Sequence, residues 1–308
     1  MADLISTISS TVVFLLAGTP LVPIGTAFIV GYPHPTIQNA SIPIVVTAKH
    51  VLGGRDRVFG RFSTVEGKST ALVEYDLSKL KTSGDYWEHP DNGVDIAVFR
   101  TPHFKATQYA PLPLTIIASK EDFSSEGIQP TDRIIFPSLL VNFMGSERNY
   151  PVTRDGTIAL IPEEKVPLRY QSGVSIVQTE QEVILVDAIS IPGASGSPIF
   201  LWPGPRIKRN AFSIGGTRPL LLGVMHGFYP AVPRELIEIK TSDVRQMYAE
   251  NSGIAIVFPS WRLREIFEQK NLKKRIDEIV SSSKAQSELI LREFVKPCSN
   301  EPIQRTAY

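Results

Sequence analysis

The chain has 308 residues with 32 basic and 31 acidic side chains, so its net charge is +1. That balance gives no support to a role on nucleic acid or on a membrane surface, and no stretch approaches the length of apolar sequence that spans a bilayer. The composition, 43% apolar and 20% charged, suits a globular protein of one large domain or two of ordinary size. The single cysteine, Cys298, excludes an intrachain disulfide and fits a reducing compartment.

The amino-terminal segment, MADLISTISSTVVFLLAGTP, has no basic region ahead of its apolar run and carries Asp3. The run TVVFLLA is short and indicates a strand rather than the apolar part of a secretion signal. We therefore expect a soluble protein of the cytoplasm.

Short runs rich in valine and isoleucine dominate the chain as far as Pro259, and glycine, proline, asparagine or aspartate bounds most of them. The first group consists of TVVFLLA (11–17), GTAFIVGY (25–32), IPIVVTA (42–48), TALVEY (70–75) and DIAVFR (95–100). The second group consists of RIIFPSLL (133–140), GTIALIP (156–162), GVSIVQ (173–178), VILVDAI (183–189), GSPIFLW (196–202), LLLGVMHG (220–227) and GIAIVFP (253–259). Strands at this spacing, without regular helices between them, predict antiparallel barrels or sandwiches.

The segment between the two groups is rich in proline and polar residues, which indicates a linker. After Pro259 the apolar positions change to a helical spacing, at Leu263, Ile266 and Phe267 and then at Ile276, Ile279 and Val280. A second helical run, KAQSELILREFVK, follows. We expect a first β unit over residues 1–110, a linker over 111–131, a second β unit over 132–260 and a helical extension over 261–308.

The stretch SIPGASGSPIF, residues 190–200, places Ser195 between two glycines and directly before an apolar run. Glycine weakens a strand interior, so its use here indicates a backbone conformation that side chains would obstruct. A serine hydroxyl needs an adjacent base to take its proton and donors that face the oxyanion developing on the attacked carbonyl. The N–H groups of Gly193 and Ser195 are candidates for this oxyanion hole, and Gly196 keeps the next position open.

His50, in IPIVVTAKHVL, is the best candidate for the base, because the apolar strand before it fixes its position. Asp95, in NGVDIAVFR, opens another apolar strand, where an unpaired carboxylate is costly to bury and a histidine N–H is one partner that satisfies it. Asp91 is a rival for this role, although it falls in the turn-forming HPDNG. The chain order histidine, aspartate, serine is that of the chymotrypsin arrangement. Each residue alone is more often structural, whereas the ordered set predicts a hydrolytic site.

These segments resemble those of trypsin-like serine peptidases of the chymotrypsin fold, of the disulfide-free bacterial kind related to the high-temperature-requirement peptidases. GTAFIV is similar to that family's Gly-Ser/Thr-Gly-Phe opening strand, VVTAKHVL to its Thr-Ala-x-His segment and DIAVFR to its Asp-Ile-Ala-Val/Leu strand. VDAISIPGASGSPIF resembles the nucleophile segment, LLLGVMHG the strand that pairs with the substrate backbone, and SGIAIVFPSWRLREIFE the closing strand and helix. The likeness covers residues 10–268.

The resemblance implies an all-β fold of two antiparallel six-stranded β-barrels with C-terminal helices and an active site in the cleft between the barrels. His50 and Asp95 would belong to the first barrel and Ser195 to the second. The implied activity is that of a serine endopeptidase on a protein or peptide: Ser195 attacks, His50 transfers protons, Asp95 orients His50, and Gly193 and Ser195 hold the oxyanion. Two alternatives remain open, an effector peptidase gated by an activating protein partner and a catalytically silent peptide-binding module.

The chain departs from the family pattern at two points. Ala194 stands where secreted trypsins carry the aspartate that pairs with a newly cut N-terminus, so activation by that kind of cleavage is not expected. We also expect no PDZ-like domain after the peptidase segment. The long segments 203–219 and 228–252 flank the substrate-pairing strand and are candidates for shaping the cleft or docking a partner.

Two segments carry the specificity signals. Ser190 lies at a position that lines the first specificity pocket in the family, and Ile189 replaces the aspartate that selects Lys and Arg in trypsin. His226 and Gly227 lie on the substrate-pairing strand, and a serine together with such a histidine resembles the acid-binding pair of glutamyl endopeptidases. One hypothesis is a preference for an acidic residue or glutamine before the cleaved bond; the other is that His226 only borders the cleft. No clustered Cys/His spacing indicates a metal site, and no cofactor is expected.

Overall fold

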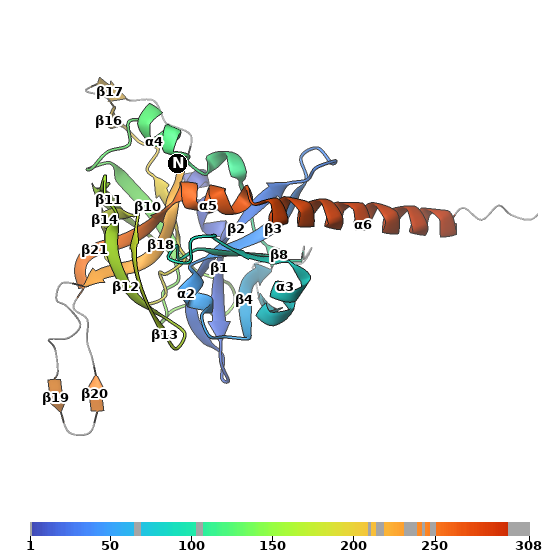
Figure 1. Cartoon of the computed structure of the whole chain (residues 1–308), viewed down its shortest axis with the longest axis horizontal. Helices are drawn as coiled ribbons and strands as arrows, with labels where there is room; N and C mark the ends of the chain where they lie inside the picture. Colours follow the sequence, from blue (N-terminus) through green and yellow to red (C-terminus); the bar gives the residue numbers. More distant parts are fainter. Residues whose placement is uncertain are drawn as a thin grey trace, which may run out of the picture.

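The strands between Val12 and Pro113 form one curled sheet of nine strands (Figure 1). The computed structural model describes residues 2–64, 69–102, 107–208, 211–213, 219–230, 239–241, 244–246 and 251–294. The strand order is β5-β4-β1-β2-β3-β7-β6, with β8 beside β4 and β9 beside β2. The strands are β1 (Val12–Ala17), β2 (Val22–Pro33), β3 (Ser41–Thr47), β4 (Arg57–Thr64), β5 (Thr70–Asp76), β6 (Tyr86–Glu88), β7 (Ala97–Arg100), β8 (Thr107–Gln108) and β9 (Leu112–Pro113).

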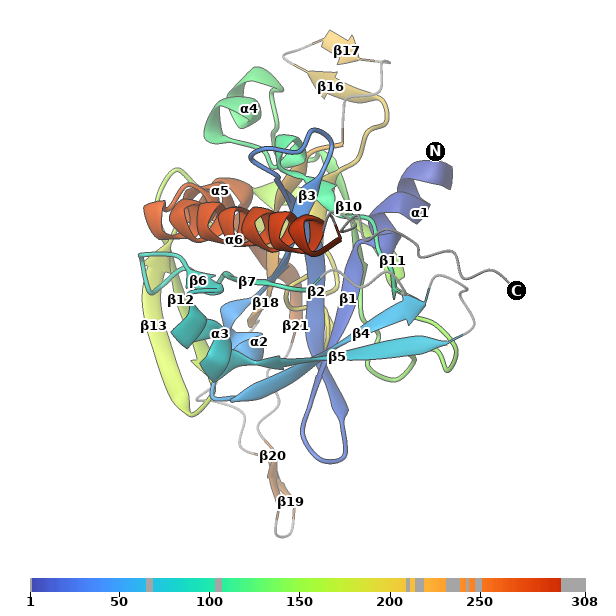
Figure 2. The ribbon, with the colours of Figure 1, turned by 90° about the vertical axis from the view of Figure 1, so that its right-hand side faces the viewer.

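The strands between Arg133 and Pro259 include a closed barrel in the order β10-β11-β14-β21-β18-β15. Its strands are β10 (Arg133–Ser138), β11 (Val152–Leu160), β14 (Ile184–Asp187), β15 (Pro198–Leu201), β18 (Leu221–Pro230) and β21 (Asn251–Pro259). Three hairpins form separate two-stranded sheets: β12 (Val166–Ser172) with β13 (Ser175–Gln181), β16 (Arg206–Lys208) with β17 (Ala211–Ser213), and β19 (Ile239–Thr241) with β20 (Val244–Gln246). The β12–β13 hairpin extends from the barrel toward the first sheet (Figure 2).

The expected chymotrypsin-like architecture is confirmed, with one difference in the first unit. The barrel of the second unit closes with six strands, as predicted, whereas the first unit is a curled half-barrel. Its edge strands β5 and β6 are joined by the helix α3 (Leu77–Ser83), which packs against both of them. The helix therefore occupies the place where a direct ladder between the two edges would close the sheet.

Several short elements were not predicted from the sequence. The first is α1 (Ala2–Ser10), which precedes β1. The second is α2 (Lys49–Leu52), directly after β3. The predicted linker also has regular structure, because it contains β9, a 3₁₀ turn, η1 (Leu114–Ile116), and α4 (Lys120–Ser125). A capping box starts α4: Ser119 accepts the backbone N–H of Asp122, and the Asp122 carboxylate accepts that of Ser119.

Three main clusters of buried apolar side chains stabilise the fold. The first fills the curled sheet and includes Val13, Leu15, Ile29, Val45 and Phe99. The second fills the barrel and includes Phe136, Ile158, Val186, Ile199 and Val257. The third joins the two units and the C-terminal helices, and includes Phe28, Phe200, Phe258, Leu263 and Leu272. Because this shared cluster is continuous, the sheet and the barrel have a fixed relative position at their contact.

The C-terminal helices confirm the helical spacing seen in the sequence. α5 (Ser260–Phe267) packs against β18 and β21, and α6 (Lys270–Phe294) continues past the first sheet and projects beyond it (Figure 1). Leu272, Ile276 and Val280 lie on one face of α6 and are buried. Among the described residues, no helix combines the length and the apolar character that a membrane span requires.

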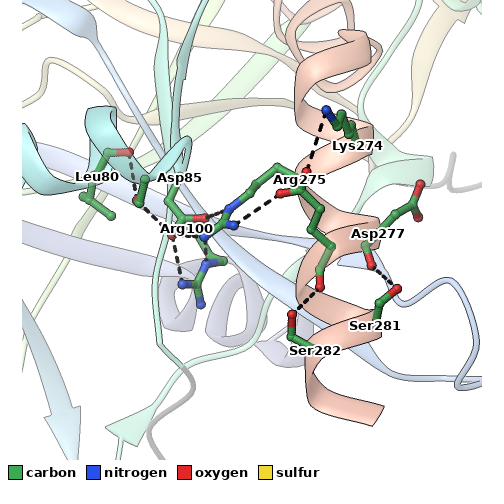
Figure 3. A network of polar contacts seen from close by, with 10 residues as sticks. Leu80, Asp85, Arg100, Lys274, Arg275, Asp277, Ser281 and Ser282 are labelled. Carbon is green, nitrogen blue, oxygen red and sulfur yellow. Dashed lines mark hydrogen bonds and ion pairs between the residues drawn. The ribbon is translucent and has the colours of Figure 1, made fainter. Parts of the chain in front are cut away.

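A buried carboxylate attaches α6 to the first sheet (Figure 3). Asp85, which is 3% exposed, accepts hydrogen bonds from Arg275 at 2.9 and 3.2 Å and from Arg100 at 3.1 and 3.0 Å. Burial alone raises the pKa of Asp85, but the two guanidinium groups outweigh it, so the pKa is lowered. The ionised form of Asp85 therefore stabilises the folded state.

We expect Asp85→Asn to lower the free energy of unfolding by about 2–3 kcal/mol at neutral pH, because two charge-assisted pairs are lost. The contribution of a carboxylate with a lowered pKa is present above its unfolded-state pKa and disappears as the pH falls through the folded-state value. The difference between the two proteins in urea denaturation is therefore expected to shrink in acid. As a control, Glu74→Gln breaks the exposed pair with Arg57 and is expected to cost at most about 0.5 kcal/mol. Equal effects of the two substitutions would contradict the role of Asp85.

Candidate active site

The pairing of β3 with β7 brings His50 and Asp95 together. Thr47 lies opposite Ala97 in this antiparallel pair, so the end of β3 adjoins the start of β7. His50 follows Thr47 in α2, and Asp95 comes just before Ala97. The backbone N–H of Lys49 donates to the carbonyl oxygen of Asp95 at 3.2 Å, which joins the two segments directly.

The buried carboxylate of Asp95 accepts two hydrogen bonds from His50. Its Oδ1 accepts the backbone N–H at 2.7 Å, and its Oδ2 accepts the ring Nδ1–H at 2.6 Å. Burial by itself lowers the pKa of His50, but the charge and hydrogen bond of Asp95 outweigh it, so the pKa of His50 is raised. Burial also raises the pKa of Asp95, yet its histidine neighbours outweigh this and the net pKa is lowered. Asp95 is thus ionised at neutral pH and holds the Nδ1 proton of His50.

His226, on β18, is a second histidine on the same carboxylate. Its Nδ1 donates to Asp95 Oδ2 at 2.5 Å, and the residue is 7% exposed. Its ring packs edge-on against His50, Tyr170 and Phe258, with ring centroids 5.0, 4.6 and 5.6 Å away. One ring nitrogen of His226 is therefore committed to Asp95. A role of His226 in binding an acidic substrate side chain stays a prediction, and it would have to use Nε2.

The loop that carries Ser195 connects β14 to β15 and meets the first sheet at Gly196. A Cβ at Gly196 would collide with the carbonyl oxygen of Thr26 and with Thr47 Oγ1. The φ of +88° at Gly196 is also one that residues with a side chain rarely adopt. The N–H of Gly196 donates to the carbonyl oxygen of Met225 at 2.7 Å. Glycine after Ser195 therefore permits the close approach of the two units.

Thr26, on β2, ties the loop before Ser195 to the first sheet. Its Oγ1 donates to the carbonyl oxygen of Gly193 at 2.6 Å and accepts the N–H of Leu139 at 2.9 Å. Its backbone N–H donates to the carbonyl oxygen of Ser195 at 2.9 Å. Because Thr26 is buried, water cannot bond to these polar groups, and the loss of any of these hydrogen bonds would leave a buried group without a partner. The residue fixes both sides of the candidate oxyanion loop.

A turn over residues 191–194 sets the direction of the peptide before Gly193. The N–H of Ala194 donates to the carbonyl oxygen of Ile191 at 3.0 Å, with proline and glycine at the two central positions. The φ of +95° at Gly193 is that of a type II turn. In the part of the chain that the structure describes, the N–H groups of Gly193 and Ser195 have no hydrogen-bond partner, which leaves both available to an oxyanion.

The hydroxyl of Ser195 donates to the backbone carbonyl of His226 at 2.8 Å. It does not bond to His50, and Nε2 of His50 has no hydrogen-bond partner among the described residues. The structure therefore places the three predicted residues at one contact between sheet and barrel. Of the three, His50 and Asp95 are joined directly.

The β12–β13 hairpin covers α2 beside His50. A Cβ at Gly53 would lie 2.7 Å from the backbone nitrogen of Gly173 at the hairpin tip, so the two backbones are in close contact. Tyr170 of β12 presents its ring to that of His50, with the centroids 6.1 Å apart. An open pocket of about 520 Å³ between α2 and the tip is lined by His50, Gly53, Gly54, Arg55, Gly173 and Val174. This pocket leaves the His50 side of the site accessible.

The remaining predicted substrate residues lie on either side of Ser195. β15 and the residues just before it pair with β18 as far as Met225. From Gly227 onward, the edge of β18 that faces β15 has no strand partner in the described ranges, while the other edge pairs with β21. Ser190 is buried, whereas Ile189 is 65% exposed. Their roles in specificity stay predictions. The segments 203–219 and 228–252 are described only in part, and Cys298 and the end of the predicted helical extension lie outside the described residues.

Asp91, the rival for the orienting acid, has other partners. Its Oδ1 accepts the N–H of Gly93 at 2.8 Å, and its Oδ2 accepts the side-chain amide of Gln181 at 3.2 Å. This carboxylate therefore stabilises its own turn and attaches the β12–β13 hairpin.

His50, Asp95 and His226 are also the group of described residues that could hold a metal ion, with one donor atom from each within 4.8 Å of the others. Two histidines and a carboxylate are ligands that Zn²⁺ accepts. An ion bound through the two Nδ1 atoms would have to displace both Nδ1–H hydrogen bonds to Asp95, which already join the three residues. The two Nδ1–H hydrogen bonds therefore explain why these three residues lie together.

Two residues of the site, Thr26 and Tyr170, were not predicted from the sequence. Thr26 had a signal, because it follows glycine in the GTAF segment at the place where the similar family carries serine or threonine. Tyr170 had none, because its ring reaches the site through a hairpin that leaves the barrel.

Comparisons with known proteins address the fold alone. No protein-family model matches the chain, and no curated protein matches it. Among solved structures, the chain is similar to the crystal structure of the MamO protease domain from Magnetospirillum magneticum in its apo form, with a TM-score of 0.51 and 12% sequence identity. The similarity covers 85% of this chain and 98% of the other. The fold is therefore trypsin-like.

Proposed function

We propose that this chain is a serine endopeptidase in which Ser195 is the nucleophile and His50 the general base. The observation that carries the proposal is the hydrogen bond from His50 Nδ1 to the buried, ionised carboxylate of Asp95. It leaves Nε2 as the basic nitrogen and stabilises the imidazolium that forms when Nε2 takes a proton. The raised pKa of His50 makes it a stronger base than an isolated imidazole.

The proposed reaction has two halves. Ser195 Oγ attacks the carbonyl carbon of the peptide bond while its proton passes to His50 Nε2. The N–H groups of Gly193 and Ser195 stabilise the oxyanion. The C–N bond then breaks, and the proton on Nε2 goes to the leaving amine. Water attacks the acyl-enzyme in the same way, giving its proton to Nε2, and the proton returns to Ser195 as the ester bond breaks.

A second candidate is a gated form of the same enzyme, and one observation favours it. The hydroxyl of Ser195 bonds to the carbonyl of His226, so it has to turn toward His50 Nε2 before it can attack. An extended peptide that pairs with the free edge of β18 would compete for that carbonyl and release the hydroxyl. An activating partner protein that reshapes the loop would do the same.

Labelling with a fluorophosphonate probe separates these candidates. The probe reacts with serine hydroxyls that a neighbouring base activates, so we expect labelling of the wild type and none of Ser195→Ala. His50→Ala is expected to lower the labelling rate by at least about 100-fold, since it removes the base. Ser78→Ala, on α3 away from the site, is the matched control and should label like the wild type.

Labelling of the wild type only in the presence of cell lysate would favour the gated enzyme. No labelling under either condition, in protein shown to be folded, would overturn the peptidase proposal. The peptide-binding module would then be the better explanation of the site.

A further inference from the structure

We propose that His226 is a positioning residue for His50, which holds the carboxylate of Asp95 in place and divides its charge between two imidazole rings. The proposal deepens the proposed function, because it concerns the base of that reaction. It differs from the substrate-binding role that the sequence suggests for His226.

The hydrogen bonds of Asp95 come from both halves of the molecule. His50, from the first unit, donates its backbone N–H to Oδ1 and its ring Nδ1–H to Oδ2. His226, from the barrel, donates its Nδ1–H to the same Oδ2. Asp95 is fully enclosed, so removal of one donor leaves an acceptor that water does not readily reach. The bond from His226 therefore fixes the carboxylate against the barrel, and His50 through it.

The backbone around His226 explains why its ring faces Asp95 and not Ser195. The pairing of β18 with β21 shifts register between Met225 and Gly227, so His226 lies in a bulge. Its ring turns to Asp95, while its carbonyl oxygen accepts the hydroxyl of Ser195 at 2.8 Å. One residue thus contacts both the acid and the nucleophile, through different groups.

The charges of the cluster predict how His226 affects His50. Two imidazolium rings 5.0 Å apart would repel each other, and both rings bond to the single negative charge of Asp95. The other titratable groups that face the cluster are Arg55 after α2, Tyr170 on β12 and Tyr86 on β6, and the carboxylates of Glu88 and Asp91 act on Tyr170 from beyond the cluster. All of these stay when His226 is replaced. Without the His226 donor, the charge of Asp95 acts on His50 alone and raises the pKa of His50.

Two substitutions test this effect. His226→Asn keeps an N–H donor at the place of Nδ1 but cannot take up a proton, and His226→Leu keeps similar bulk without a donor. For the leucine variant we expect kcat to fall about tenfold with KM nearly unchanged, and the acid limb of the kcat/KM profile to move up by about half a pH unit. The asparagine variant should restore kcat to within about twofold of the wild type.

An NMR titration of His50, in a Ser195→Ala background, reads the same pKa without any turnover. The wild-type cluster should show two low-field Nδ1–H signals and the leucine variant one, with a higher pKa for His50. This outcome supports the proposal even if the chain proves not to be a peptidase. Unchanged titration and kcat in the leucine variant would overturn it. A His226→Asn variant with kcat as low as that of His226→Leu would also overturn it. A His226→Leu variant as inactive as His50→Ala would overturn it too, because it would indicate His226 as the base.

Discussion

Replacement of Asp95 by asparagine is expected to lower kcat/KM on a peptide substrate by about four orders of magnitude, the effect seen when a Ser-His-Asp site loses its carboxylate in this way. An amide nitrogen donates hydrogen bonds and accepts none. If it faces the two rings, His50 must place its proton on Nε2, where it blocks proton transfer from Ser195. If the amide nitrogen takes the place of Oδ1 instead, its N–H group faces the backbone N–H of His50, and no hydrogen bond forms there. Either orientation removes a bond that holds the base.

Asp91→Asn is the matched control for this substitution, since it makes the same change on the rival carboxylate. Its Oδ1 accepts a turn N–H and its Oδ2 a glutamine amide, so the expected effect on kcat/KM is less than about tenfold. Both rates should be measured on protein with a wild-type melting profile. A loss of activity in Asp91→Asn that matches Asp95→Asn would contradict the assignment of Asp95.

The pair His50 and Asp95 could be predicted because local patterns determine it. Each residue adjoins an apolar strand, and antiparallel neighbours place the end of one strand beside the start of the next. The position of Ser195 could be predicted for a similar reason, because Gly193 and Gly196 indicate a backbone that leaves no room for side chains. These three positions could be predicted because the residues next to each strand or turn indicate them locally.

The contact of His226 could not be predicted in the same way. Which face of a strand a residue occupies alternates along the chain, and a single bulge reverses it. The bulge at His226 depends on the pairing of β18 with β21, which no local pattern records. The run 173–178 was predicted as a strand of the second β unit, whereas it forms the turn and the start of β13 in a separate hairpin with β12. The reason is related: its residues suit any antiparallel strand, whichever neighbour it pairs with.

Gly193→Ala is expected to lower kcat by about 100- to 1,000-fold while the protein stays folded, because it removes one donor from the oxyanion hole. Alanine disfavours the φ of +95° that Gly193 adopts. Its Cβ would also lie 2.8 Å from Val141 Cγ2. The type I turn, with a negative φ at this position, relieves the backbone strain and rotates the Pro192–Gly193 peptide, which turns the N–H of residue 193 away from the oxyanion.

The same substitution at Gly84 separates this effect from general backbone strain. Gly84 ends α3 with a φ of +76°, and the atom nearest to an added Cβ is Arg275 Cδ at 3.9 Å. Gly84→Ala should therefore cost a similar stability, about 1–2 kcal/mol, with wild-type turnover and fluorophosphonate labelling. If Gly193→Ala also showed wild-type turnover, the N–H of residue 193 would not be an oxyanion donor. Because Thr26 holds the carbonyl of Gly193 from the first sheet, Thr26→Val would then be the next variant to measure.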